Sequence, residues 1–177
     1  MDTRKLWLFG ALAVAVALWI ASRTKPGAQV VASVTDAIAS NVRGIRNNNP
    51  GNIREAATGG DAWRGERATD DDPAFEEFSE MRYGVRAAAV VFRTYQRKYS
   101  LRTVTQLVSR WAPPEENDTA SYIASVAKRV GVDAFAPIDL GNAETCYRFL
   151  RAIFRHECGI AAEAIPEGPI REGIALA

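Results

Sequence analysis

The sequence predicts a mainly α-helical fold in which one small helical domain follows a single N-terminal transmembrane helix. Three observations support this prediction. One run near the N-terminus is apolar and uncharged, and several later segments carry apolar residues at helical spacing between residues typical of helix ends. No segment alternates apolar and polar residues as a half-buried strand does. The 177 residues suffice for one ordinary domain and an appendage.

The composition is that of a globular protein. Apolar residues make up 47% of the chain and charged residues 24%, which argues against wholesale disorder. The formal net charge is only +1, so the chain lacks the basic excess that is typical of nucleic-acid-binding proteins. We therefore expect no nucleic-acid partner.

The transmembrane prediction rests on residues 6–21, which read LWLFGALAVAVALWIA. Basic residues flank this run on both sides, and Trp7 and Trp19 lie near its ends, where aromatic residues meet the membrane interface. The run is at the short edge of the roughly 17 to 25 residues that span a bilayer. A cleaved signal peptide or a buried core helix are the alternatives, but the run is long for a signal-peptide core and no clean cleavage site follows. We expect a retained anchor over 1–22 that contacts the lipid bilayer through 6–21.

Residues 23–42 are predicted to be a linker. Pro26 and Gly27 break regular structure, and the remainder is small, polar or weakly apolar, although its second half could form a short helix. A domain over 43–177 then follows. It begins with a loop rich in turn residues, and Phe75 and Phe78 further on suggest a short strand or turn that docks on the core.

The first two helices of the domain are predicted over 84–99 and 104–111. The former carries apolar residues at helical spacing. Thr103 is a suitable N-cap for the latter, which Pro113 terminates.

Two further helices are predicted from their capping residues. One begins after Asn117 or Asp118 and stops at Gly131. The last long helix begins after Asn142 and ends at Gly159.

The two cysteines of the chain are predicted to be free thiols. Cys146 and Cys158 lie twelve positions apart in the last long helix, which corresponds to about 18 Å at the helical rise. A disulfide requires Cα atoms within about 7 Å of each other.

The loop over 46–54, RNNNPGNIR, is dense in amide side chains. Amides suit the recognition of sugar hydroxyl and N-acetyl groups, because each supplies a hydrogen-bond donor and an acceptor. The alternative is ordinary turn chemistry, since Asn tolerates left-handed backbone conformations and Pro-Gly forms tight turns. The loop contributes Asn49, Asn52 and Arg54 as candidate substrate contacts.

Glu157 is the candidate catalytic acid. It ends a helix whose preceding turns are apolar, and an apolar setting favours the protonated form of a carboxyl group. Cleavage of a glycosidic bond needs such an acid to protonate the leaving oxygen. The alternative is a solvated Glu at a helix end. The neighbouring His156 is the one histidine of the chain, which excludes the His-Glu-x-x-His zinc motif, and we expect neither a metal nor a cofactor.

Other residues are weaker candidates for the same site. Trp111, before a double proline, suits either stacking on a sugar ring or packing in the core. Asp72 and Glu77 are candidates for a second carboxylate, although a solvated charge run is the alternative reading of 69–72.

Together, the strings RGIRNNNPGNIR, YGVRAA, WAPPEENDT and AIFRHE.G resemble small phage and prophage proteins that are muralytic enzymes or virion structural proteins. The resemblance covers 43–159, and some members carry an N-terminal hydrophobic segment. A more distant similarity links the chain to lysozyme-like proteins, including lytic transglycosylases, in which a catalytic Glu ends a helix in a Glu-Ser-Gly pattern. Glu157-Cys158-Gly159 matches that pattern except at the serine. In bacterial glucosaminidases the Asn-containing segment follows the Glu, whereas here it precedes it.

The resemblance implies a lysozyme-like domain that cleaves the β-1,4 bond between N-acetylmuramic acid (MurNAc) and N-acetylglucosamine (GlcNAc) in peptidoglycan. Glu157 would donate the proton, and the substrate's own 6-hydroxyl or acetamido group would supply the nucleophile. Asn49, Asn52 and Arg54 would hold the glycan, with Trp111 and Tyr122 as stacking or hydroxyl contacts.

The anchor would place the protein in the host inner membrane, facing the periplasm, or in a virion membrane, with virion proteins as possible partners. Two alternatives remain open. The first is a non-catalytic structural protein of the virion or membrane that binds glycan with a lysozyme-like fold. The second is an unrelated helical interaction module such as a lysis regulator.

Overall fold

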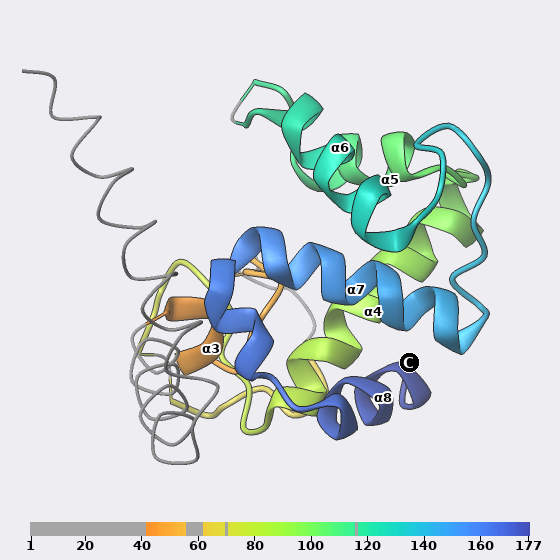
Figure 1. Cartoon of the computed structure of the whole chain (residues 1–177). Coiled ribbons are helices and arrows are strands. Elements are labelled where there is room, and N and C mark those ends of the chain that lie inside the picture. The colour runs from red at the N-terminus through yellow and green to blue at the C-terminus, as the bar shows by residue number, and fades with distance from the viewer. Residues whose placement is uncertain (1–41, 56–61, 70, 116) are drawn as a thin grey trace, which may run out of the picture. The chain divides into compact units, whose positions relative to one another are not determined.

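Helix α4 (Met81–Tyr99) has nineteen residues and its buried face consists of small and aromatic side chains, including Ala88 and Phe92. Small residues allow other helices to approach closely, and α4 accordingly contacts three of them, α5 (Val104–Trp111), α7 (Ala143–Glu157) and α8 (Glu167–Ala175). The computed structural model (Figure 1) describes residues 42–55, 62–69, 71–115 and 117–177.

The described residues confirm a mainly helical fold. They also include the short helix α3 (Arg43–Arg46), helix α6 (Thr119–Val130) and the 3-10 helix η1 (Gly159–Ala164). No extended strand occurs in the described part of the chain, which contains only isolated β-bridges such as Arg54 with Phe75 and Glu66 with Phe78. These bridges bring the segment around Phe78 onto the core, where the Phe78 side chain is fully buried.

Helix α4 begins three residues before the predicted start at Gly84. The ends predicted from capping residues are confirmed, because each is set by a local hydrogen bond or backbone conformation. Thr103 and Gln106 form a reciprocal capping box at the start of α5. Asp118, rather than the alternative Asn117, caps α6 by accepting a hydrogen bond from the Ser121 backbone N–H at 3.1 Å.

Three further predicted boundaries are also found. Gly131 ends α6 in the left-handed conformation, with φ of 80°. Asn142 caps α7 by accepting from the backbone N–H groups of Glu144 and Thr145. Gly159 follows the end of α7 with φ of 60°.

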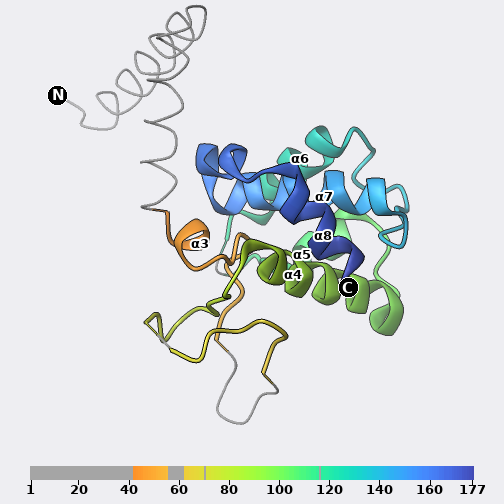
Figure 2. The same cartoon turned by 90° about the horizontal axis from the view of Figure 1, so that it is seen from below.

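The core lies where α4, α5 and α7 meet. Phe92 of α4 packs its ring against Phe149 of α7, with centroids 4.9 Å apart, and against Trp111 at the end of α5, at 4.6 Å. Helix α6 packs on α5 and α7, and α8 lies beside α4 in both views (Figures 1 and 2). The helices that carry the candidate site residues are therefore fixed to one another by a single apolar core.

Three helical segments were not predicted. Helix α3 occupies part of the predicted opening loop, and η1 and α8 follow the last predicted helix. All three are short, and short helices derive their stability from tertiary contacts rather than from sequence propensity. Helix α8, for example, is held by the packing of Ile170 and Ile174 into the core.

The described residues lie within one compact unit, Ala39–Ala177, whose start is four residues before the predicted domain boundary. The predicted anchor over 1–22 and nearly all of the predicted linker over 23–42 lie outside the described residues. Among the helices that the structure does describe, none is both long and apolar enough to cross a bilayer.

Candidate active site

The carboxylate of Glu157, the last residue of α7, accepts hydrogen bonds from three side chains. The Tyr122 hydroxyl donates to Oε1 at 2.8 Å and the Trp111 indole N–H donates to the same oxygen at 3.1 Å. The Asn52 amide donates through Nδ2 to Oε2 at 3.1 Å. The structure thus brings together four of the predicted site residues, which come from α7, α6, α5 and the loop after α3.

Glu157 lines a cleft of about 370 Å³. The lining combines amide, aromatic and cationic side chains with apolar ones. Its polar and aromatic members are Asn52, Arg54, Tyr95, Trp111, Asn117 and Glu157. Among the described lining residues, Glu157 is the sole carboxylate. Arg54, which is one of the predicted substrate contacts, is exposed and lines this cleft.

The two arginines nearest to Glu157 in sequence do not pair with it. Arg151 and Arg155 both bind the carboxylate of Glu163, at 3.0 and 3.2 Å. Within the described residues Glu157 makes no ion pair, so its carboxylate is held by neutral donors and stays open to the cleft.

The loop that carries Asn52 is pinned by Asn49. The Asn49 amide donates to the backbone carbonyls of Ile53 and Glu76, and its oxygen accepts from the Ile53 N–H. Only 1% of Asn49 is exposed. The expectation that Asn49 contacts substrate is therefore corrected: both of its N–H groups and its side-chain oxygen bond to the backbone and fix the loop, and the residue does not line the cleft.

The same loop lies directly on α4. Asn48 and Asn52 both adopt left-handed backbone conformations, with φ of 52° and 48°, which Asn tolerates better than most residues. At Gly84 of α4, an added Cβ would lie 1.9 Å from the Asn48 carbonyl oxygen. Only glycine at position 84 permits this approach, and Gly51 of the loop then rests against the Trp111 ring.

Tyr122 serves as a hydrogen-bond donor to Glu157. Its ring is stacked on that of His156, with centroids 3.5 Å apart and planes within 10°, and the residue is only 2% exposed. Burial, followed by the Glu157 charge, raises the pKa of the Tyr122 hydroxyl above its ordinary value. The hydroxyl therefore remains protonated and available as a donor. The expectation that Tyr122 makes a stacking or hydroxyl contact with a sugar is not supported, because its ring is stacked on His156, its surface is almost fully buried and its hydroxyl donates to Glu157.

Trp111 packs in the core, as one of its two predicted roles requires, and also lines the cleft. Its ring packs against Phe92 in the core, while its indole N–H points at Glu157 and part of its surface lines the cleft. The buried part fixes the orientation of the part that faces the cleft.

The two predicted second carboxylates are engaged elsewhere. Asp72 accepts a hydrogen bond from the Asn47 amide at 2.8 Å. Glu77, which is 6% exposed, pairs with Arg67 at 3.0 Å and accepts from the Asp71 backbone N–H. Neither lines the Glu157 cleft. Both carboxylates order the loop before α4, so the expectation of a second acid at these positions is not supported.

Both cysteines are free, as predicted, and both are buried. Burial raises the pKa of the Cys158 thiol to about 12, and the adjacent Glu157 charge acts in the same direction. The thiol donates to the carbonyl of Pro50 at 3.4 Å. Cys158 therefore stays protonated and ties the end of α7 to the asparagine-rich loop.

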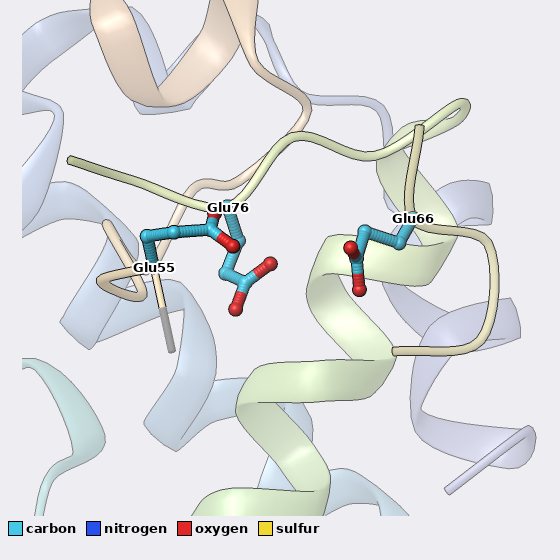
Figure 3. A group of neighbouring side chains, drawn as sticks. All are labelled: Glu55, Glu66 and Glu76. Carbon is cyan, nitrogen blue, oxygen red and sulfur yellow. The ribbon is translucent and has the colours of Figure 1, made fainter. Parts of the chain in front are cut away.

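A separate acidic cluster was not predicted. One carboxylate oxygen from each of Glu55, Glu66 and Glu76 lies within 4.8 Å of the others (Figure 3). Carboxylate oxygens are ligands for hard cations such as Ca²⁺. Glu66 also accepts a hydrogen bond from the Trp63 backbone N–H at 2.6 Å. The three residues follow no known ligand spacing, so sequence reasoning had no signal for the cluster.

No family model matches the chain. The chain is similar to Protein P5 of Pseudoalteromonas phage PM2, with 51% identity over 90 residues. The match covers 51% of this chain and 56% of the phage protein, so the chain spans just over half the length of this relative. The phage part of the resemblance is thereby confirmed: this protein has a bacteriophage homologue.

Proposed function

We propose that the helical unit is a lysozyme-like, phage-encoded domain that cleaves the β-1,4 bond between MurNAc and GlcNAc in peptidoglycan. One observation carries the proposal. The Glu157 carboxylate lines a cleft and is held there by three neutral donors. A carboxyl group that is oriented in this way, without a cationic partner among the described residues, is suited to proton transfer.

The cleft lining suits a glycan. Aromatic faces such as those of Tyr95 and Trp111 stack on sugar rings, and the amides of Asn52 and Asn117 pair with hydroxyl and N-acetyl groups. The exposed Arg54 adds a cation, which is complementary to the carboxylate groups of muramic acid and its peptides.

We assign the proton to Oε2 of Glu157. Oε1 already accepts two hydrogen bonds, and the Trp111 indole can only donate, whereas Oε2 accepts from Asn52 alone. The Oε2 proton would pass to the glycosidic oxygen as its bond to C1 of MurNAc breaks, with the bonding electrons staying on that oxygen. The GlcNAc side then leaves with a free hydroxyl group.

The nucleophile would come from the substrate. Retaining glycosidases with two carboxylates place them about 5 Å apart, and inverting enzymes about 6.5 to 9.5 Å apart. Of the described cleft residues only Glu157 is a carboxylate. We therefore expect the MurNAc 6-hydroxyl to attack C1, which closes a 1,6-anhydro ring and returns its proton to Glu157. The acid is thus regenerated, and no water is consumed.

We further propose that residues 6–21 hold the domain at a membrane. A bilayer anchor would confine the domain to wall close to the host inner membrane or to a virion membrane, where the local concentration of glycan strands is high. Virion proteins are then possible neighbours.

The test is digestion of purified peptidoglycan by the full chain, with the released fragments analysed by mass spectrometry. Three proteins are compared: wild type, Glu157→Gln, and Glu163→Gln as the matched control. The control removes an equal charge six positions further along and leaves the three donors to Glu157 in place.

The expected result is release of fragments with 1,6-anhydro ends by wild type and by Glu163→Gln, but not by folded Glu157→Gln. Reducing ends would instead indicate hydrolysis. If wild type sediments with the wall but releases nothing, the alternative of a non-catalytic glycan-binding virion protein replaces this proposal. Full activity of Glu157→Gln would refute the role of Glu157.

A further inference from the structure

The side chain of Asn52 is satisfied at one end only. Its Nδ2 donates to Glu157 Oε2 at 3.1 Å, while its Oδ1 is buried and has no hydrogen-bond partner in the described structure. A buried polar atom without a partner is costly and calls for a physical reason. Backbone mobility does not explain the missing partner, because the Asn52 backbone N–H donates a hydrogen bond to the Asn49 carbonyl at 2.9 Å and fixes the loop.

Asn52 Oδ1 lies in a tightly packed position beside Gly44. A Cβ at position 44 would lie 2.9 Å from Asn52 Oδ1, 2.9 Å from the Asn49 carbonyl oxygen and 2.7 Å from Cys158 Sγ. A side chain at position 44 would therefore displace the amide, and the Asn49 carbonyl oxygen lies near the same point as Oδ1. Because a carbonyl oxygen can accept a second hydrogen bond, this position suits an N–H donor better than an oxygen.

We infer that the Asn52 side-chain amide has two orientations toward Glu157. In one, Nδ2 donates a hydrogen bond to the ionised carboxylate. In the other, the amide is rotated by about 180°, and Oδ1 accepts a hydrogen bond from the carboxyl group protonated at Oε2. A carboxamide has nearly the same shape after this turn, so the exchange needs no backbone movement. In the turned state Nδ2 takes the place of Oδ1 beside Gly44, near the Asn49 carbonyl oxygen and Cys158 Sγ.

This inference rests on the proposed function and deepens it. An acid that gives up its proton and takes one back in each turnover must be held equally well in both forms. Tyr122 and Trp111 hold Oε1 as donors, and only Asn52 offers both a donor and an acceptor of comparable geometry to Oε2. Asn52 is thereby a positioning residue for the proton, in addition to its place on the cleft wall.

The titratable groups around Glu157 do not compete for this role. Tyr122 of α6 and Cys158 at the end of α7 keep their protons, because burial raises the pKa of each. His156 of α7 stacks on Tyr122 and is not among the residues that line the cleft. The two remaining groups, Arg54 of the loop and Tyr95 of α4, line the cleft.

The inference is tested on the isotopically labelled full chain by the nuclear Overhauser effects of the Asn52 side-chain NH₂ protons, without any substrate. In wild type, the contact between these protons and the Gly44 Hα protons should be weak at neutral pH and become stronger at acidic pH. In Glu157→Gln, a fixed mimic of the protonated acid, the contact should have the strong, acidic-pH intensity at every pH. The NH₂ protons of Asn48, which donate to the Phe78 carbonyl at 2.9 Å, serve as the internal control and should keep the same neighbours.

An Asn52 amide that keeps the same neighbours at both pH values would overturn the inference, and the wild-type titration gives this answer even if the variant fails to fold. The result is independent of wall digestion. An amide that turns in a protein that releases no fragments refutes the proposed function alone, whereas a fixed amide in an active enzyme refutes this inference alone.

Discussion

The Tyr122 hydroxyl offers a direct measure of how strongly the site holds its carboxylate. Tyr122→Phe removes one donor at 2.8 Å from Glu157 Oε1 and leaves the ring stacked on His156. A hydrogen bond to a charged group contributes about 1.5 to 3 kcal/mol. The Trp111 donor at 3.1 Å remains on the same oxygen, so the lower half of that range applies, about 1.5 to 2 kcal/mol. Because Tyr122 is almost fully buried, water cannot replace the lost hydroxyl without repacking.

The assay is urea unfolding of wild type, Tyr122→Phe, Glu157→Gln and the double variant at neutral pH. The double-mutant cycle isolates the part of the hydroxyl's contribution that depends on the carboxylate charge, and we expect a coupling of about 1 to 2 kcal/mol. Tyr147→Phe, on the same helix as Glu157 but outside the cleft, should change stability by less than about 0.5 kcal/mol. If the hydroxyl stabilises the transition state of wall digestion by a similar free energy, Tyr122→Phe should digest peptidoglycan roughly tenfold more slowly than wild type. If Tyr122→Phe is as stable as wild type, or the coupling is zero, the carboxylate is not held as described.

Three further predictions concern the loop and its surroundings. Gly84→Ala places a Cβ against the Asn48 carbonyl oxygen and should lower the free energy of unfolding in urea by more than about 2 kcal/mol. The control Gly168→Ala, whose Cβ would have no atom within 4 Å, should be neutral or slightly stabilising. Equal effects of the two variants would contradict the close approach of the loop to α4. The pKa of His156, measured by NMR titration, should lie below 6.5, because burial lowers it more than the nearby Glu157 carboxylate raises it. The stability that His156 contributes is therefore present above pH 6.5 and lost as the pH falls through its folded-state pKa. Glu157→Gln should lower this pKa further, and a pKa above 6.5 would refute the prediction. Asn52→Asp places a second carboxylate beside that of Glu157. The variant should lose about 1 to 3 kcal/mol of stability near neutral pH, and less in acid, where the two groups are protonated. A loss that does not change with pH would argue against the contact between positions 52 and 157.

The helix boundaries could be predicted because they depend on neighbours in sequence. The Thr103 capping box and the left-handed Gly131 involve residues within one helical turn, and the printed letters contain all the information needed. Helix α8 depends instead on the packing of Ile170 against distant segments, which no local pattern records.

The membership of the site could be predicted better than the roles of its members. Glu157 and Asn52 are 105 positions apart, and only the resemblance to lysozyme-like proteins placed both in one site. Whether an amide faces the cleft or the loop interior depends on tertiary packing, which is why Asn52 and Asn49 were given the same role but have different ones. Likewise, nothing in the letters around Tyr122 shows that His156 covers its ring.

The order of the site residues along the chain has a consequence for biosynthesis. The three donors to the carboxylate precede it, and the carboxylate itself comes at the end of the last long helix. A growing polypeptide on the ribosome therefore contains the three donors long before it contains the carboxylate that they hold. Truncated products that end before residue 157 lack this carboxylate altogether, so the complete hydrogen-bonded group forms only after nearly all of the domain has been translated.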